Sequence, residues 1–200
     1  MTKVLIASNN PGKIKEFKDL LQGFGADVFS LKDLGITTDV PETGHTFHEN
    51  AALKAEALAK ETGMITLADD SGLCVDALNG EPGVFSARYS GPEKDSERNI
   101  DLLLHKLKGV PEEKRTAHFV CVLALSRPKH QTRFAEGRCD GIITATRRGV
   151  GGFGYDPLFL IPERQETFAE MGEAEKNQIS HRARALRVLK ENWTSWTGEA

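Results

Sequence analysis

Paired carboxylates at the end of a predicted strand are the first residues in the sequence whose types and spacing could do chemistry. Asp69 and Asp70 follow an apolar run at residues 64–68, and Ser71 and Gly72 complete a predicted turn directly after them. Adjacent carboxylates repel each other, and a divalent cation or a shared proton is the usual reason to place them together. A solvated acidic turn is the alternative, but open α/β sheets bind ligands at strand ends, which favours a functional site.

A polar segment between the first predicted strand, at residues 4–7, and a predicted helix is the second candidate. The segment consists of Ser8, Asn9, Asn10, Pro11, Gly12 and Lys13. Backbone amides at a helix start and the positive end of the helix dipole attract phosphate, and Lys13 and Lys15 add positive charge. The sequence does not contain the P-loop pattern G-x-x-x-x-G-K-[ST]. An ordinary helix N-cap is the alternative interpretation.

The third candidate is a glycine-rich segment with a literal G-x-G-x-x-G at residues 149–154. In dinucleotide-binding proteins a helix starts inside this pattern, whereas Pro157 and the apolar run after it predict a strand. The segment is then a flexible backbone that carries Phe153, Tyr155 and Asp156, which suits wrapping a flat base. A plain glycine hairpin is the alternative.

Lys176 and the run Ser180-His181-Arg182 form the fourth candidate, before and at the start of the last predicted helix. These side chains offer hydrogen-bond donors in fixed directions, and the planar fork of arginine suits the O6 and N7 acceptors of a purine. Ordinary surface residues are the alternative.

The elements that must position these residues alternate between strand and helix in the first third of the chain, and long strands dominate later. We expect strands at residues 4–7, 26–31, 64–68, 116–126, 131–144 and 158–161, and helices at residues 14–24, 46–62, 100–107 and 183–193. Thr46 and Glu49 fit a capping box at the start of the second helix, and Gly63 closes it. This mixture predicts an α/β fold with a mixed sheet in one continuous domain over residues 1–200, with a tail at residues 193–200.

Composition and charge narrow the class of protein. The 200 residues are 39% hydrophobic and 28% charged, and 26 basic against 29 acidic residues give a formal net charge of -3. A general nucleic-acid binder needs a strong basic excess, and the longest apolar run, residues 119–125, is far shorter than the ~20 residues that cross a bilayer. We therefore expect a cytoplasmic protein without a nucleic-acid or membrane partner.

The number and spacing of the cysteines also favour a cytoplasmic protein. Cys74, Cys121 and Cys139 are scattered, and their odd number favours a reducing compartment. His118 and Cys121 have a spacing that zinc ligands can have, but no C-x-x-C pair accompanies them. We expect Cys121 to be a core residue and not a zinc ligand.

The four candidate segments together are much more specific than any one of them. In the same order and at similar spacing they occur in the inosine and xanthosine triphosphate pyrophosphatases, and the chain resembles the bacterial dITP/XTP pyrophosphatase branch, the RdgB/HAM1 family. The resemblance runs from about Lys3 to Leu189 and includes Glu42 and Lys54. One departure is Ala183, where a glycine commonly follows the His-Arg pair.

This resemblance implies an elongated mixed β-sheet with flanking helices, in two lobes around a central cleft, assembled as a homodimer. It implies Mg²⁺-dependent hydrolysis of dITP, ITP, XTP and dXTP to the monophosphate and pyrophosphate, which cleanses the nucleotide pool. Ser8 to Lys13 would bind the triphosphate, Glu42 and Asp70 would hold the metal with support from Asp69, and Asp70 would also accept the proton. Substrate contacts would come from Ser71, Phe153, Gly154, Tyr155, Asp156, Lys176, His181 and Arg182.

Two functions of other classes stay open at this point. A non-catalytic purine-nucleotide sensor would keep the phosphate and base sites, but it would have little use for Glu42 beside paired aspartates. A nicotinamide oxidoreductase would need the glycine pattern to open a helix, which Pro157 opposes. Release of pyrophosphate would separate the enzyme from the sensor.

Overall fold

The computed structural model describes residues 2–21 and 25–198. The end of the first predicted helix at Phe24 and the last two residues of the predicted tail lie outside this part. The helices are α1 (Pro11–Leu21), α2 (Phe47–Thr62), α3 (Ser96–Lys106), α4 (Glu173–Ile179) and α5 (His181–Thr197). The strands are β1 (Thr2–Ile6), β2 (Ala26–Ser30), β3 (Ile65–Val75), β4 (Thr116–Ser126), β5 (Arg133–Ile143), β6 (Phe159–Ile161) and β7 (Glu166–Thr167).

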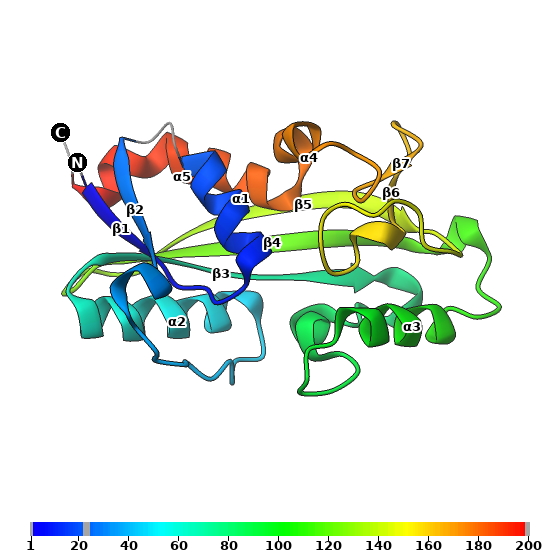
Figure 1. The fold of residues 1–200 in the computed structure, drawn as a ribbon, viewed down its shortest axis with the longest axis horizontal. Helices are drawn as coiled ribbons and strands as arrows, with labels where there is room; N and C mark the ends of the chain where they lie inside the picture. Colours follow the sequence, from blue (N-terminus) through cyan, green and yellow to red (C-terminus); the bar gives the residue numbers. More distant parts are fainter. Residues whose placement is uncertain (1, 22–24, 199–200) are drawn as a thin grey trace. The chain divides into compact units, whose positions relative to one another are not determined.

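The strands of the described residues form a seven-stranded sheet in the order β2-β1-β3-β4-β5-β6-β7 (Figure 1). β1 pairs in parallel with both β2 and β3, whereas β6 pairs antiparallel with both β5 and β7. The sheet is therefore mixed, and the predicted α/β fold with flanking helices is confirmed.

The chain divides into two compact units, which we call unit 1 and unit 2. Unit 1 contains residues 1–70, 121–137 and 182–200, and unit 2 contains residues 71–120 and 138–181. β3, β4 and β5 contribute residues to both units. The predicted cleft between two lobes of a single domain stays a prediction.

Each unit has its own hydrophobic core. In unit 1, Phe17 of α1 and Leu189 of α5 pack with Val4 of β1 and Leu123 of β4, and α2 lies on the opposite face of these strands (Figure 1). In unit 2, the core is built from α3, the outer parts of β3, β4 and β5, and several aromatic rings. Its largest buried members include Leu73, Ile100, Leu103, Phe159 and Phe168.

The helix boundaries of α2 follow the predicted caps. The Thr46 hydroxyl accepts a hydrogen bond from the Glu49 amide at 3.1 Å, and Gly63 ends the helix with a φ of 71°. The Glu49 carboxylate accepts from the amide of His45, one residue before the cap, at 2.6 Å. Both ends of α2 are thus fixed by local hydrogen bonds, which makes it a firm support for side chains.

One predicted boundary is wrong. The run from Asp69 to Gly72 is not a turn after a short strand, because β3 continues through it to Val75. Both aspartates are nevertheless buried, at 2% and 5% exposure. Buried carboxylates inside a strand are stable only when other parts of the chain compensate them, and such partners are not visible in the local pattern.

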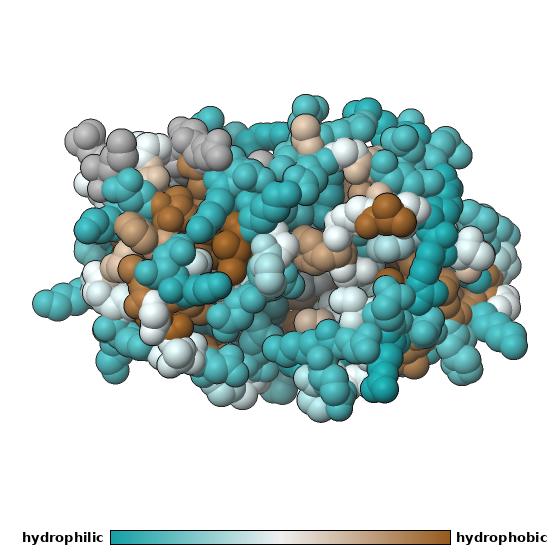
Figure 2. Space-filling model, in the orientation of Figure 1, coloured by the Kyte–Doolittle hydropathy of each residue, from teal (hydrophilic) through white to brown (hydrophobic). Residues whose placement is uncertain are grey.

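The surface carries few large hydrophobic side chains. Those that are exposed among the described residues are Leu34, Leu53, Phe85, Phe134, Val150 and Val188. On the face that Figure 2 shows, hydrophilic residues cover most of the area and hydrophobic ones emerge between them. No helix in the described part of the chain is long and apolar enough to cross a membrane.

Candidate functional site

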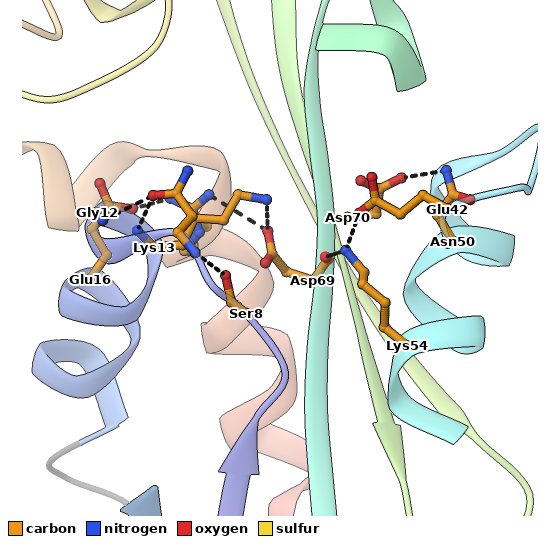
Figure 3. A network of polar contacts seen from close by, with 11 residues as sticks. Ser8, Gly12, Lys13, Glu16, Glu42, Asn50, Lys54, Asp69 and Asp70 are labelled. Atoms are coloured by element: carbon orange, nitrogen blue, oxygen red, sulfur yellow. Dashed lines mark hydrogen bonds and ion pairs between the residues drawn. The ribbon is translucent and has the colours of Figure 1, made fainter. Parts of the chain in front are cut away.

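Successive residues of a strand point to opposite faces of the sheet, and this separates the two aspartates of β3. Asp69 points towards α1 and α5, where Lys13 and Arg182 meet it. Asp70 points towards α2, where it accepts a hydrogen bond from Asn50 Nδ2 at 3.0 Å. Figure 3 shows the two carboxylates turned to the two sides of the strand.

Cations surround Asp69. Its Oδ2 lies 2.9 Å from Lys13 Nζ and 3.7 Å from an Arg182 guanidinium nitrogen. Burial by itself would raise the pKa of Asp69, but Lys13, Arg182 and Lys54 together hold the pKa well below its usual range. Asp69 is therefore an ionised carboxylate that fixes the position of these cations.

Arg182 is buried, at 1% exposure, and is held from several sides. One guanidinium nitrogen is paired with Glu16 on α1, and the group lies 5.5 Å from the centre of the Phe17 ring. Desolvation opposes the charge, but the carboxylates of Glu16 and Asp69 raise the pKa of Arg182 above its usual value. The guanidinium is thus permanently charged and fixed in direction.

The polar segment before α1 is organised by one side chain. Asn10 Oδ1 accepts from the amides of Gly12 at 2.9 Å and Lys13 at 3.2 Å, and the Asn10 amide donates to Ser8 Oγ at 3.2 Å. Pro11 occupies the first helical position, where its missing N–H costs nothing. The predicted convergence of amides is present, but in this structure Asn10 takes two of them.

Asp70 lies in an environment that opposes ionisation. Burial raises its pKa to about 6, with a further contribution from Glu42, while Lys54, Lys13 and the Asn50 hydrogen bond act in the opposite direction. Asn50 is fully buried, and its Oδ1 accepts from the Gly44 amide at 2.8 Å. A carboxylate with such a pKa is suited to accept a proton near neutral pH.

Glu42 and Asp70 were predicted to hold a metal. Within the described residues no group of three or more His, Cys, Asp or Glu side chains is arranged as a metal site. Mg²⁺ commonly takes only one or two carboxylates and completes its coordination with water and substrate phosphates. Glu42 raises the pKa of Asp70, so these two acids repel each other, and a divalent cation would relieve that repulsion. The residues fit Mg²⁺.

Unit 2 contains the other candidate residues, and a buried ion pair joins several of them. Asp156 Oδ2 accepts from Lys176 Nζ at 2.7 Å and from the Phe153 amide at 2.9 Å. The Lys176 ammonium also lies 4.8 Å from the Phe153 ring and 5.5 Å from the Phe168 ring. Gly152, with a φ of 70°, is required here, because a Cβ would lie 2.0 Å from Asp156 Oδ2.

Tyr155 and His181 are core residues as well as members of predicted motifs. Tyr155 is 5% exposed and its hydroxyl donates to the Ser86 carbonyl at 2.7 Å, so its ring is part of the core of unit 2. The His181 ring stacks on Phe119 with centroids 4.7 Å apart. Gly154 has a φ of 59°, and a Cβ placed on it would have no atom within 4 Å. Ser71 is half-buried on β3.

The predicted site residues from Lys13 onward thus form two groups, and Ser8, Asn9, Asn10, Pro11 and Gly12 precede them in unit 1. Lys13, Glu42, Asp69, Asp70 and Arg182 are linked in unit 1, directly or through Lys54. Those of unit 2 are Ser71, Phe153, Gly154, Tyr155, Asp156, Lys176 and His181. Two of the four motifs contribute to both groups, because the chain passes from one group to the other within each of them. The first passes between Asp70 and Ser71, and the second between His181 and Arg182.

A family model described as the Ham1 family matches residues 4–192. The chain belongs to the Ham1 family. A curated relative from Bacillus subtilis, named dITP/XTP pyrophosphatase, is 51% identical over 94% of this chain and 96% of its own length. A second relative of that name, from Geobacillus kaustophilus, is 52% identical over 99% of this chain and 97% of its own. The solved structure of the Staphylococcus aureus Ham1 protein is 44% identical, with a TM-score of 0.87 and complete coverage of both chains.

In this Ham1 chain the structure adds three residues that the predicted site did not contain: Glu16, Asn50 and Lys54. Lys54 Nζ donates to Glu42 Oε1 at 2.6 Å and to the Asp69 carbonyl at 2.5 Å. Asn50 and Lys54 are four residues apart on α2 and so share one helix face. The family resemblance included Lys54 without a role for it. The four-residue spacing of Asn50 and Lys54 was the local signal that both side chains lie on the same face of α2.

Proposed function

We propose that the chain is a nucleoside-triphosphate pyrophosphatase that hydrolyses dITP, ITP, XTP and dXTP to the monophosphate and pyrophosphate. The names of two relatives that are about half identical over nearly the whole chain support this substrate class. The observation that carries the proposal is the group in unit 1, where Glu42 is paired with Lys54 at 2.6 Å, Asp69 is paired with Lys13 at 2.9 Å, and the buried Asp70 follows Asp69 on β3. A non-catalytic sensor of purine nucleotides would have little use for these three carboxylates.

In the proposed reaction, unit 1 handles the phosphates and the attacking water. Lys13, held by Asp69, offers its positive charge to the triphosphate as pyrophosphate departs. Ser8, Asn9, Asn10, Pro11 and Gly12 would line the phosphates. Asp70 accepts the proton of the water, for which its raised pKa is suited.

Mg²⁺ would be held by Glu42 and Asp70, with Asp69 in support. When bound, it neutralises phosphate charge and favours ionisation of a water. Carboxylate oxygens suit this hard cation.

We propose that the group in unit 2 and Arg182 recognise the base and sugar. The ion pair between Asp156 and Lys176 fixes the backbone of Phe153 and the direction of its ring, so that the ring can stack on a base. Gly154 and Tyr155 would contribute backbone, and Ser71 and His181 further contacts. Arg182 only donates, so a keto oxygen at position 6 of the purine satisfies it and an adenine amino group does not.

The Ham1 resemblance also supports a homodimer that works in the cytoplasm and cleanses the nucleotide pool of deaminated purines. These properties belong to the same proposal.

A nucleotide panel tests the proposed function. Purified protein is incubated with dITP, XTP, ATP and GTP, each with and without Mg²⁺, and pyrophosphate and orthophosphate are measured separately. We expect pyrophosphate from dITP and XTP only when Mg²⁺ is present, with far slower release from ATP and GTP. Binding of all four nucleotides without any release would support the sensor instead.

A further inference from the structure

A lysine is paired with Glu42, one of the two carboxylates that were assigned to the metal. Lys54 Nζ lies 2.6 Å from Glu42 Oε1 and 2.5 Å from the Asp69 carbonyl oxygen, and it also interacts with the Asp70 charge. The Lys54 side chain is only 14% exposed and that of Glu42 25%. In Figure 3 the ammonium lies between β3 and the Glu42 segment. One internal cation thus interacts electrostatically with three acidic residues, Glu42, Asp69 and Asp70.

The position of Lys54 is dictated by α2. The helix is capped at both ends, and its Asn50, one turn before Lys54, is bonded to Asp70 and to the Gly44 amide. The Cα of Lys54 is therefore fixed, whereas its four-carbon stem can move the ammonium by several ångströms. The segment that carries Glu42 is held in part by the Lys54 ion pair.

A divalent cation on Glu42 and Asp70 would lie close to the Lys54 ammonium on Glu42 Oε1, and two positive charges a few ångströms apart repel each other. Metal binding to Glu42 and Asp70 is therefore weakened for as long as Lys54 stays on Glu42. In the free chain an ammonium that leaves this place gives up its hydrogen bonds to Glu42 and to the Asp69 carbonyl. A nucleoside triphosphate brings the negative charge that can draw the ammonium away.

We propose that Lys54 is an internal counter-cation which keeps divalent metal off Glu42 and Asp70 until a nucleoside triphosphate arrives. This inference rests on the proposed function, because it takes Glu42 and Asp70 as the metal ligands. Its consequence is ordered loading: the free enzyme binds metal weakly, and the metal enters together with the nucleotide. The simpler alternative is that Lys54 only pins the Glu42 segment to α2.

Metal binding to the nucleotide-free protein separates the two possibilities, because they predict opposite signs. Mn²⁺ and Mg²⁺ are titrated calorimetrically into wild type, Lys54→Met, Lys54→Arg and Lys60→Met. Lys60 is an exposed lysine of the same helix and serves as the matched control. We expect Lys54→Met to bind metal at least about tenfold more tightly than wild type, a typical size for coupling between sites. Lys54→Arg and Lys60→Met should bind as wild type does.

Unchanged or weaker metal binding by Lys54→Met overturns the inference. Weaker binding supports the alternative, in which Lys54 only holds the Glu42 segment against α2. Thermal melting shows whether the variant is folded. If it is not, Lys54→Gln, whose amide keeps a neutral donor near Glu42, takes its place with the same expectation and the same overturning result.

Wild-type turnover distinguishes failure of the inference from failure of the proposed function. If wild type releases pyrophosphate with Mg²⁺ but Lys54→Met gains no metal affinity, only the inference falls. If wild type releases no pyrophosphate with any divalent cation, the proposed function falls and the inference with it.

Discussion

At the scale of single residues, two neighbouring aspartates have opposite properties because a strand turns them to opposite faces. Asp69 meets Lys13 and Arg182 and has a pKa below the usual range. Asp70 meets a buried amide and another acid, and its pKa rises to about 6. Environments that push the pKa values of two acids apart also separate their roles, one as a fixed charge and the other as a proton acceptor.

Asp70→Asn should remove activity and stabilise the free chain. The folded-state pKa lies above the unfolded value, so this group favours folding most at low pH, and its contribution falls as the pH rises from about 4 to about 6. At pH 7.5 the ionised Asp70 costs the fold on the order of 1–3 kcal/mol, which the neutral amide avoids. We expect a higher free energy of unfolding in urea and a loss of turnover of about 10²-fold or more. A variant that keeps a tenth of wild-type kcat would contradict the role of Asp70.

The pH dependence of the wild-type enzyme follows from the same group. Asp70 must be ionised to accept a proton, so kcat/KM, which reports the free enzyme, should fall as the pH drops through about 6. The measurement is a kcat/KM profile for dITP between pH 5 and pH 9 at subsaturating Mg²⁺, because a cation held by Asp70 would lower its pKa. A flat profile down to pH 5 would show that this carboxylate is not the acceptor.

At the scale of elements, the group in unit 1 and the group in unit 2 each receive polar side chains from the inner face of a helix. α2 presents Asn50 and Lys54 to β3, and α4 presents Lys176 to the loop with Asp156. A buried ion pair is expensive to break, because one charge is then left without a partner.

Lys176→Met tests how α4 and the glycine-rich loop depend on each other. The side chains of Lys176 and Asp156 are 6% and 4% exposed, so the single change should lower the free energy of unfolding by about 3 kcal/mol. Adding Asp156→Asn removes the stranded charge, and the double variant should be more stable than the single one. Urea unfolding of the two single variants, the double variant and wild type completes the cycle. Strictly additive losses would mean that the pair is not coupled.

Much of the fold and part of the site could be predicted from the sequence, for identifiable physical reasons. Thr46 and Gly63 mark α2 because caps are local interactions, and the long apolar patterns of β4 and β5 identify strands directly. α4 was missed because it has only seven residues and no side-chain cap. The aspartates of β3 were taken for a turn because their compensating partners come from distant parts of the chain.

The roles of aromatic residues depended still more on tertiary structure. Phe153 and Tyr155 look alike in the glycine-rich segment, yet Tyr155 belongs to the core and donates to Ser86, whereas Phe153 lies against Lys176. Only the surrounding core decides which ring is buried. Lys54 was part of the family resemblance but was given no role, since nothing local shows that its ammonium reaches β3.

At the scale of the whole molecule, the proposed homodimer gives a direct expectation. One chain has a mass of 22.0 kDa, so light scattering at micromolar concentration should give about twice that value. The Asp70→Asn variant should behave identically, because Asp70 is buried, at 5% exposure, and is not a surface residue. A scattering mass of a single chain would contradict the dimer and leave the proposed chemistry untouched.

In the proposed reaction, water attacks the α-phosphorus of a deaminated purine triphosphate while the β- and γ-phosphates leave together. The most direct test is ³¹P NMR of the products from dITP and Mg²⁺ in ¹⁸O-labelled water. We predict labelled dIMP and unlabelled pyrophosphate, because the solvent oxygen joins the phosphorus that is attacked. Label in pyrophosphate, or formation of dIDP with orthophosphate, would contradict the account.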